Sequence, residues 1–101
     1  MCSINASELY QRLQRDERLD ILDVREAIEY HTYNIGGLNI PVNRLQQNID
    51  DIAYNKTDEI IVICSAGIRS KTAQAILLEN GFKNVLNLKG GLIALQKQGL
   101  I

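Results

Sequence analysis

Residues 59–70 read EIIVICSAGIRS, and this stretch decides the fold class. The apolar run Ile60–Ile63 is short, continuous and β-branched, which is typical of a strand covered on both sides within a parallel sheet. Cys64 ends this run, Gly67 lies in the loop that follows, and a helical pattern begins near Ser70. The stretch therefore predicts a buried strand, a tight loop and a helix, with a thiol where the strand ends.

The predicted loop surrounds the Cys64 thiol with groups that favour a thiolate. Gly67 can adopt a positive φ, which turns successive backbone N–H groups inward and forms an anion-binding nest. Arg69 places a guanidinium beside this nest, and the following helix adds the positive end of its dipole. Ser70 can either cap the helix or donate its hydroxyl toward the thiolate. Cys64 is therefore a candidate nucleophile, and the alternative is a small, inert apolar residue at a strand end.

The composition of the chain excludes several classes of protein. Its 101 residues suit one domain, and a hydrophobic share of 46% suffices for one packed core. Eleven Lys and Arg against twelve Asp and Glu give a net charge of −1, which argues against nucleic acid as the main partner. No apolar run is long enough to span a membrane, and the N-terminus lacks a basic segment followed by an apolar one. We therefore expect a soluble, cytoplasmic protein that does not act at a membrane.

Outside the loop, few residues indicate a site. Cys2 and Cys64 are the only cysteines, which is too few for a disulfide framework. A bridge between them is the less favoured alternative, and we expect Cys2 to be mobile near the terminus. His31 is the only histidine and has no metal-ligand spacing around it, so we expect neither a metal site nor a cofactor.

Strands alternate with helices along the whole chain, without repeats or linkers. Asn5 and Glu8 have the spacing of a capping box at a helix start. The expected helices are 6–14, 27–31, 43–53, 70–80 and 92–97, and the expected strands are 19–24, 38–40, 60–63 and 85–88. This order predicts a single α/β domain over residues 1–101, with a mostly parallel sheet flanked by helices. Ligand sites in such sheets lie at the carboxyl ends of the strands, where Cys64 is expected.

The chain resembles a single-domain rhodanese, a family of sulfurtransferases, from about Ile4 to Leu100. The active-loop segment carries the specific part of this match. The matching segments are LDVRE at 22–26 with Glu29 and Tyr30, NIP at 39–41, CSAGIRS at 64–70, and VLNLKGG at 85–91 with Gly99 and Leu100. The resemblance implies the three-layer fold of that family.

The resemblance also implies a mechanism and a set of site residues. Cys64 would attack the outer sulfur of thiosulfate or of a persulfide, and would pass it on to cyanide, a thiol or a protein acceptor. The active-loop residues that would bind the donor are Ser65, Ala66, Gly67, Ile68, Arg69 and Ser70. The backbone N–H groups of this loop would stabilise the terminal sulfur of the persulfide, and Arg69 would hold the loop and bind anion. By the same analogy Asp23 and Arg25 would brace the loop through hydrogen bonds, the alternative being an ordinary surface ion pair.

The chain departs from the family pattern in ways that concern the sulfur donor. The family usually has Gly-His-Ile where this chain has residues 33–35, YNI, and Leu95 replaces a tryptophan. Family members that use thiosulfate well often carry a basic residue inside the loop, whereas the loop side chains before Arg69 are uncharged here. Arg69 and Lys71 are the nearby cations. The departures at 33–35 and at Leu95 concern the rim of the pocket, whereas the uncharged loop favours a persulfide or a protein-bound sulfur as the donor over thiosulfate.

Other functions stay open on the sequence alone. Cysteine-based phosphatases also end such a loop in arginine, but with five intervening residues rather than the four between Cys64 and Arg69. Rhodanese-like modules also act as regulatory docking domains, although these commonly lack the cysteine. A redox sensor would need Cys2 as its resolving thiol. A sulfur relay would use the same chemistry with a protein acceptor, for which Ile68 is a candidate contact.

Overall fold

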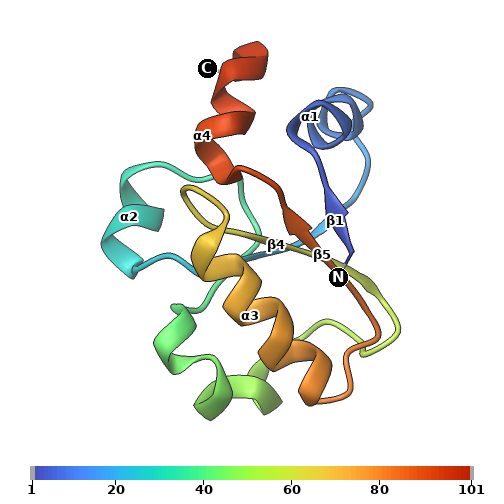
Figure 1. Ribbon diagram of the computed structural model, residues 1–101, viewed down its shortest axis with the longest axis vertical. Helices are drawn as coiled ribbons and strands as arrows, with labels where there is room; N and C mark the ends of the chain where they lie inside the picture. Colours follow the sequence, from blue (N-terminus) through green and yellow to red (C-terminus); the bar gives the residue numbers. More distant parts are fainter. Residues whose placement is uncertain (1, 101) are drawn as a thin grey trace.

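The computed structural model describes residues 2–100 and has a five-stranded parallel sheet at its centre (Figure 1). The strands are β1 (Ser3–Ile4), β2 (Asp20–Asp23), β3 (Leu38–Asn39), β4 (Glu59–Ile63) and β5 (Asn84–Leu88). Their order across the sheet is β1-β5-β4-β2-β3, and every neighbouring pair is parallel. This confirms the predicted α/β class, with β4 as the central strand.

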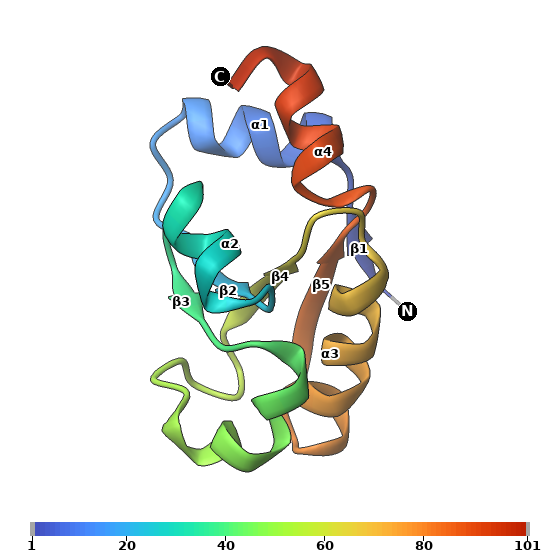
Figure 2. The ribbon, with the colours of Figure 1, turned by 90° about the vertical axis from the view of Figure 1, so that its left-hand side faces the viewer.

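Helices cover both faces of the sheet, as Figures 1 and 2 show from two directions. The α-helices are α1 (Ala6–Gln14), α2 (Ala27–Thr32), α3 (Ile68–Glu79) and α4 (Gly91–Leu95). Two 3₁₀ segments, η1 (Val42–Arg44) and η2 (Gln46–Asp51), precede β4, and a π-helical segment, η3 (Gln96–Leu100), follows α4. Helices α1 and α4 pack together on one face, and α3 packs on the other together with η1.

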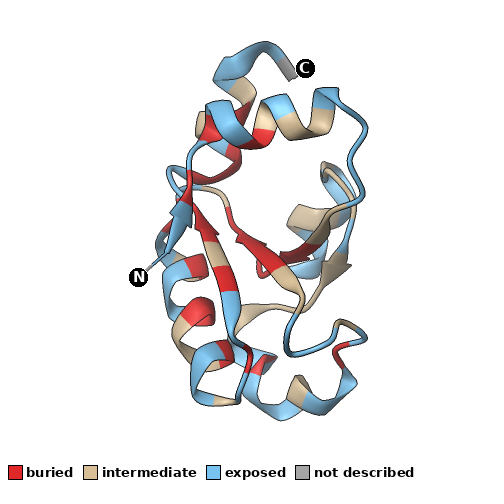
Figure 3. Cartoon of the chain, turned by 90° about the vertical axis from the view of Figure 1, so that its right-hand side faces the viewer, coloured by how far each residue is buried: buried red, intermediate tan, exposed pale blue. Residues whose placement is uncertain are grey.

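Alternation along β4 divides the core into two layers. Ile60 and Val62 belong to the cluster on the α3 side, whereas Ile61 and Ile63 belong to the cluster on the α1 and α4 side. All four side chains have 0% exposure, and Figure 3 shows that burial is concentrated in the strands. The continuous apolar run in the sequence is explained by this two-sided burial. The three-layer arrangement that the sequence predicts is confirmed.

The prediction of one helix over 43–53 is wrong. The segment forms η1 and η2 instead, and a kink at Asn48, with φ −109° and ψ 17°, interrupts it. The Asn48 side chain donates to the Arg44 carbonyl at 2.9 Å, so it competes locally with a continuous helix. Leu45, Ile49 and Ile52 have the spacing of one helix face, and Leu45 and Ile52 are nevertheless buried in the core. The spacing therefore identified the inward side chains but not the type of helix.

At the N-terminus the structure confirms one prediction and differs from the sequence analysis in two details. The capping box is confirmed, because the Glu8 N–H donates to Asn5 Oδ1 at 2.8 Å and the Asn5 N–H donates to the Glu8 carboxylate at 3.2 Å. Strand β1 was missed, since two residues are too short for periodicity to reveal. The expected mobility of Cys2 is wrong for its backbone, because the Cys2 carbonyl accepts from the Asn87 N–H at 3.2 Å and from Gln74 Nε2 at 2.7 Å.

The remaining helix boundaries differ from the expected ones by a few residues. Helix α3 begins at Ile68 rather than Ser70, and α4 gives way to η3 at Gln96. Within residues 2–100 no helix combines the length and the apolar character that crossing a membrane requires.

Candidate functional site

Cys64 lies at the carboxyl end of β4, at the centre of the sheet, and is 1% exposed. The chain turns directly after it through Gly67, which has a φ of +92° and serves as the N-cap residue of α3. A side chain at Gly67 would be strained at this φ and would press on the backbone of Gly90, 3.1 Å from the Cβ position. The predicted positive φ is confirmed, and it places the loop above the edge of the sheet where ligands bind in this class of fold.

Backbone groups after β5 hold the loop from behind. The Leu92 N–H donates to the Cys64 carbonyl at 2.9 Å, and the Ile93 N–H donates to the Ser65 carbonyl at 3.0 Å. A Cβ at Gly91 would overlap the backbone carbonyl group of Ser65. The Gly-Gly pair of the C-terminal segment thus allows the start of α4 to approach the loop closely. The sequence analysis did not predict this contact.

The sulfur of Cys64 accepts hydrogen bonds from backbone N–H groups at the start of α3, where a capping side chain would otherwise be the acceptor. The Gly67 N–H donates to Sγ at 3.1 Å and the Ser70 N–H donates at 3.3 Å. Burial of the thiol acts to raise the pKa of Cys64, but hydrogen bonds from the Ser70 hydroxyl and from the loop N–H groups outweigh it and lower that pKa. The site therefore favours a thiolate, as the sequence predicted, through N–H donors that converge on one atom.

Ser70 lies inside α3 and does not cap it, so that alternative from the sequence is wrong. Its hydroxyl oxygen is 3.3 Å from Cys64 Sγ, and the thiol donates to it. The Ser70 hydroxyl in turn donates to Asn87 Oδ1 on β5. Ser70 and Asn87 are 0% and 3% exposed, so both sit beneath the thiol in the interior. Sequence reasoning missed Asn87, because nothing in the segment VLNLKGG indicates that its strand, β5, lies beside β4 and the loop that follows β4.

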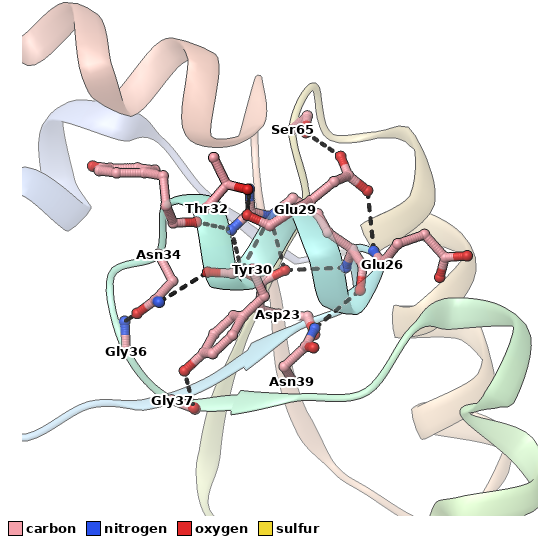
Figure 4. Close-up of polar contacts among 12 residues, drawn as sticks. Asp23, Glu26, Glu29, Tyr30, Thr32, Asn34, Gly36, Gly37, Asn39 and Ser65 are labelled. Atoms are coloured by element: carbon pink, nitrogen blue, oxygen red, sulfur yellow. Dashed lines mark hydrogen bonds and ion pairs between the residues drawn. The ribbon is translucent and has the colours of Figure 1, made fainter.

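Arg69 is fixed by a partner that the sequence did not identify. Its guanidinium binds Glu29 of α2 through two bonds, 2.6 Å from Nη1 to Oε1 and 3.0 Å from Nη2 to Oε2. Ser65 Oγ lies 3.3 Å from both the Arg69 guanidinium and the Glu29 carboxylate. Figure 4 shows Ser65 and Glu29 turned toward each other across the gap between the loop and α2. The arginine thus ties the loop to α2, and its charge is already compensated.

Asp23 and Arg25 form a buried pair rather than a surface one. Arg25 Nη2 is 2.7 Å from Asp23 Oδ2, and the two side chains are 7% and 0% exposed. Arg25 also donates to the Tyr33 carbonyl at 2.6 Å and to the Glu29 carbonyl at 3.4 Å. Within residues 2–100 neither side chain forms a hydrogen bond with residues 64–70. The expected direct hydrogen bonds from this pair to the loop are therefore not found, and Arg25 instead contacts the Glu29 carbonyl of α2, the helix whose Glu29 side chain binds Arg69.

The other loop residues face outward. Ala66 is exposed, Ser65 is half-buried, and Ile68 is 76% exposed beside the loop. No group of His, Cys, Asp and Glu side chains among residues 2–100 has the arrangement of a metal site.

Protonation of Glu29 should weaken the link between α2 and the loop. The hydrogen bond from Arg69 lowers the pKa of Glu29 from 4.5 to about 2, so the pair stabilises the fold above about pH 4.5 and stops doing so as the pH falls toward 2. Both side chains are about one-third exposed, so the contribution is below about 1 kcal/mol. In urea unfolding from about pH 5 to about pH 2.5, we expect the wild type to lose more stability than Glu29→Gln.

The matched control for that comparison is Glu79→Gln, which removes an exposed carboxylate that has no ion pair among residues 2–100. This variant should follow the wild type across the pH range. Equal losses in the wild type and in Glu29→Gln would contradict the assigned ion pair.

Comparison with known proteins connects this geometry to a family. The family profile of the rhodanese-like domain matches residues 5–98. The chain is 37% identical over 90 residues to "Putative sulfur carrier protein YrkF" of Bacillus subtilis, covering 88% of this chain and 48% of that protein. It is 33% identical over 98 residues to a protein named "Sulfurtransferase" of Allochromatium vinosum, covering 96% and 90%. A tRNA uridine(34) hydroxylase of Buchnera aphidicola is 36% identical over 78 residues, covering 72% of this chain and 25% of that protein. The chain thus spans about half or less of two of these relatives.

Solved structures show the same fold. A rhodanese-like domain protein from Staphylococcus aureus superposes with a TM-score of 0.82 at 29% identity, covering 94% of this chain and 91% of that one. The protein SSP1007 from Staphylococcus saprophyticus superposes with a TM-score of 0.84 at 30% identity, covering 100% and 99%. The matched profile, the parallel sheet and the cysteine-centred loop agree, and the chain belongs to the rhodanese-like domain family.

Proposed function

We propose that this chain is a sulfurtransferase that carries sulfane sulfur as a persulfide on Cys64. The observation that carries the proposal is the convergence of loop N–H groups on a buried sulfur with a lowered pKa. Such an environment activates a thiolate for attack and stabilises negative charge on a sulfur held in the loop. The relatives named sulfur carrier and sulfurtransferase support the same class of chemistry.

The reaction divides into two exchanges at sulfur. The Cys64 thiolate attacks the outer sulfur of the donor, a new S–S bond forms, and the donor leaves with the electron pair of the broken bond, as sulfite from thiosulfate or as a thiolate from a persulfide. A nucleophilic acceptor, cyanide or a thiolate, then attacks the terminal sulfur and releases the Cys64 thiolate. Because the enzyme holds a covalent intermediate between the two exchanges, the kinetics should be ping-pong.

We expect a persulfide to load Cys64 faster than thiosulfate does. The charge of Arg69 is compensated by Glu29, and the side chains of Ser65, Ala66 and Ile68 carry no charge. The loop therefore offers little net positive charge to the dianion thiosulfate. The reacting end of a persulfide needs less positive charge at the loop. The measurement is the intact mass of the wild-type protein at intervals after mixing with glutathione persulfide or thiosulfate at equal concentration.

A gain of one sulfur atom, removed by cyanide or a reducing thiol, would support the proposed function with either donor. Faster loading by thiosulfate would contradict the donor preference alone. No gain with either donor on folded, reduced protein would contradict the persulfide mechanism.

A sulfur relay with a protein acceptor is the second candidate function, and a regulatory docking module is the non-catalytic form of the same idea. The observation that favours a protein partner is the position of three of the four large exposed apolar side chains among the described residues. Ile68, Ile28 and Ile93 are 76%, 76% and 50% exposed, and each lies in a segment that forms or contacts the loop. A docking module would bind its partner through this surface equally well after Cys64→Ser, whereas a relay would lose transfer to that partner.

A further inference from the structure

A cavity lies apart from the active loop, between α3 and the β1–β5 edge of the sheet. Its volume is about 370 Å³, and none of its lining residues belongs to the segment 64–70. We call it the lysine pocket; its lining residues are Cys2, Ser3, Lys71, Gln74, Asn87 and Lys89. Figure 1 shows β1, β5 and α3, the elements that carry or adjoin these residues.

The lysine pocket carries positive charge without a compensating carboxylate. Lys71 and Lys89 both line it, and no acidic residue does. Among residues 2–100 no carboxylate lies within 4.0 Å of either ammonium group. Two cations that share one concave surface produce a local positive potential that attracts anions.

Asn87 adds a buried hydrogen-bond donor to the same pocket. Its side chain is 3% exposed, its Oδ1 accepts from Ser70, and its Nδ2 has no partner among the described residues. Since no fully buried side-chain nitrogen or oxygen among the described residues lacks a partner, Nδ2 keeps some exposure, and we place it at the pocket that Asn87 lines. An amide NH₂ group between two lysines can only donate, so its complement is an acceptor with negative charge, which is an oxyanion.

The same asparagine connects the pocket to the nucleophile. The Ser70 hydroxyl has one proton, and two acceptors compete for it: Asn87 Oδ1 and the sulfur of an ionised Cys64. While Oδ1 faces Ser70, the hydroxyl proton is drawn toward the asparagine, and the thiolate receives a weaker hydrogen bond from Ser70. If the amide turns over, Nδ2 donates to the Ser70 oxygen and the hydroxyl is free to donate to the thiolate. The orientation of one amide therefore sets how well Ser70 stabilises the thiolate.

We propose that the lysine pocket binds a small oxyanion, and that the bound anion keeps the Ser70 hydroxyl on Asn87 and away from Cys64. The anion accepts from Nδ2 and so fixes the amide with Oδ1 toward Ser70. Its negative charge also opposes a thiolate nearby, so both effects have the same sign. The inference deepens the proposed function, on which its biological meaning rests, because the pocket would slow sulfur uptake when an oxyanion accumulates. By reciprocity, ionisation of Cys64 weakens binding of the anion.

The first experiment measures binding with inorganic sulfate, inorganic phosphate and acetate as separate probes, each at an ionic strength matched with sodium chloride. The side-chain NH₂ signal of Asn87 in NMR spectra reports on the pocket directly. We expect saturable shifts of that signal, and at least about tenfold weaker binding in the double variant Lys71→Gln/Lys89→Gln, because two charge-assisted contacts are lost. The ranking of the three probes distinguishes a sulfur oxyanion, a phosphate and a carboxylate as the ligand.

The matched control is Lys83→Gln/Lys97→Gln, which removes the same charge from two exposed lysines outside the pocket. This variant should bind the probes as the wild type does. Equal binding in both double variants, or an unmoved Asn87 signal with all three probes, would overturn the proposed site.

The second experiment measures the coupling as the rate of alkylation of Cys64 by iodoacetamide, followed by mass on the peptide that contains it. Below the pKa of the thiol, saturating probe should slow alkylation about threefold in the wild type, which corresponds to a rise of about half a pKa unit. The slowing should vanish in the double variant Lys71→Gln/Lys89→Gln, and it should be smaller in Asn87→Leu, which keeps only the effect of the anion's charge. The charged groups on the other side of the thiol, the Glu29–Arg69 and Asp23–Arg25 pairs, are the same in every variant.

Slowing that is lost or reduced in the pocket variants supports the proposal. Equal slowing in all variants would mean that the anion acts at the loop, and the proposal would be wrong. If Asn87→Leu fails to fold, the double variant Lys71→Gln/Lys89→Gln still decides whether the anion acts through the lysine pocket. Alkylation needs no sulfur donor, so a failure of the coupling and a failure of the persulfide mechanism are told apart.

Discussion

Cys64→Ser should abolish sulfur loading and leave the fold in place. The hydroxyl of serine is not ionised near neutral pH, so the N–H donors that stabilise a thiolate have no anion to act on. The side chain is buried, but the change removes little volume and keeps a hydrogen-bond acceptor for Gly67 and Ser70. We expect a stability change of about 1 kcal/mol. The intact mass after incubation with glutathione persulfide should show no added sulfur.

The other cysteine supplies the control for this experiment. Cys2 is free and exposed, so Cys2→Ser should load sulfur as the wild type does. Sulfur on the Cys64→Ser protein, or loss of loading in Cys2→Ser, would remove Cys64 from its assigned role. A circular dichroism spectrum and urea unfolding of each variant separate a loss of chemistry from a loss of fold.

Gly91→Ala should be among the most damaging glycine-to-alanine changes and should act directly on the loop. The new Cβ would overlap the carbonyl group of Ser65 and would come within 2.5 Å of the Cys64 carbonyl oxygen. Backbone atoms cannot rotate away, so the loop or the start of α4 must move. The residue also has a φ of +65°, which alanine adopts at a cost. Together we expect a loss of about 3 kcal/mol or more in the free energy of unfolding.

Gly36→Ala separates the clash from the backbone strain. Gly36 has a φ of +93° but nothing within 4 Å of its Cβ position, so it carries the strain alone. We expect about 1 kcal/mol for this control. Urea unfolding gives both values, and alkylation of Cys64 reports on the loop, which should change only in Gly91→Ala. Similar losses in the two variants would show that the loop does not depend on the close approach of Gly91.

Local sequence signals predicted the centre of the site correctly. The β-branched run before Cys64 and the glycine after it specify a strand that ends in a tight turn, and both are properties of consecutive residues. The capping box of α1 was found in the same way, from two residues three positions apart. The segment 43–53 shows the limit of such reasoning. Its apolar spacing was right, yet a side chain that competes for a backbone carbonyl at Asn48 decided its conformation.

By itself, the sequence determined a mostly parallel α/β domain with a cysteine where a buried strand ends in a tight loop, because these features follow from periodicity and from neighbours along the chain. Only the tertiary structure decided what surrounds that thiol. Glu29 meets Arg69 across 40 positions of sequence, and Asn87 meets Ser70 across 17. Such contacts form because α2 and β5 are packed beside the loop by the sheet order. No local pattern encodes them, so the charge of Arg69 and the proton of Ser70 acquire their partners only in the folded chain.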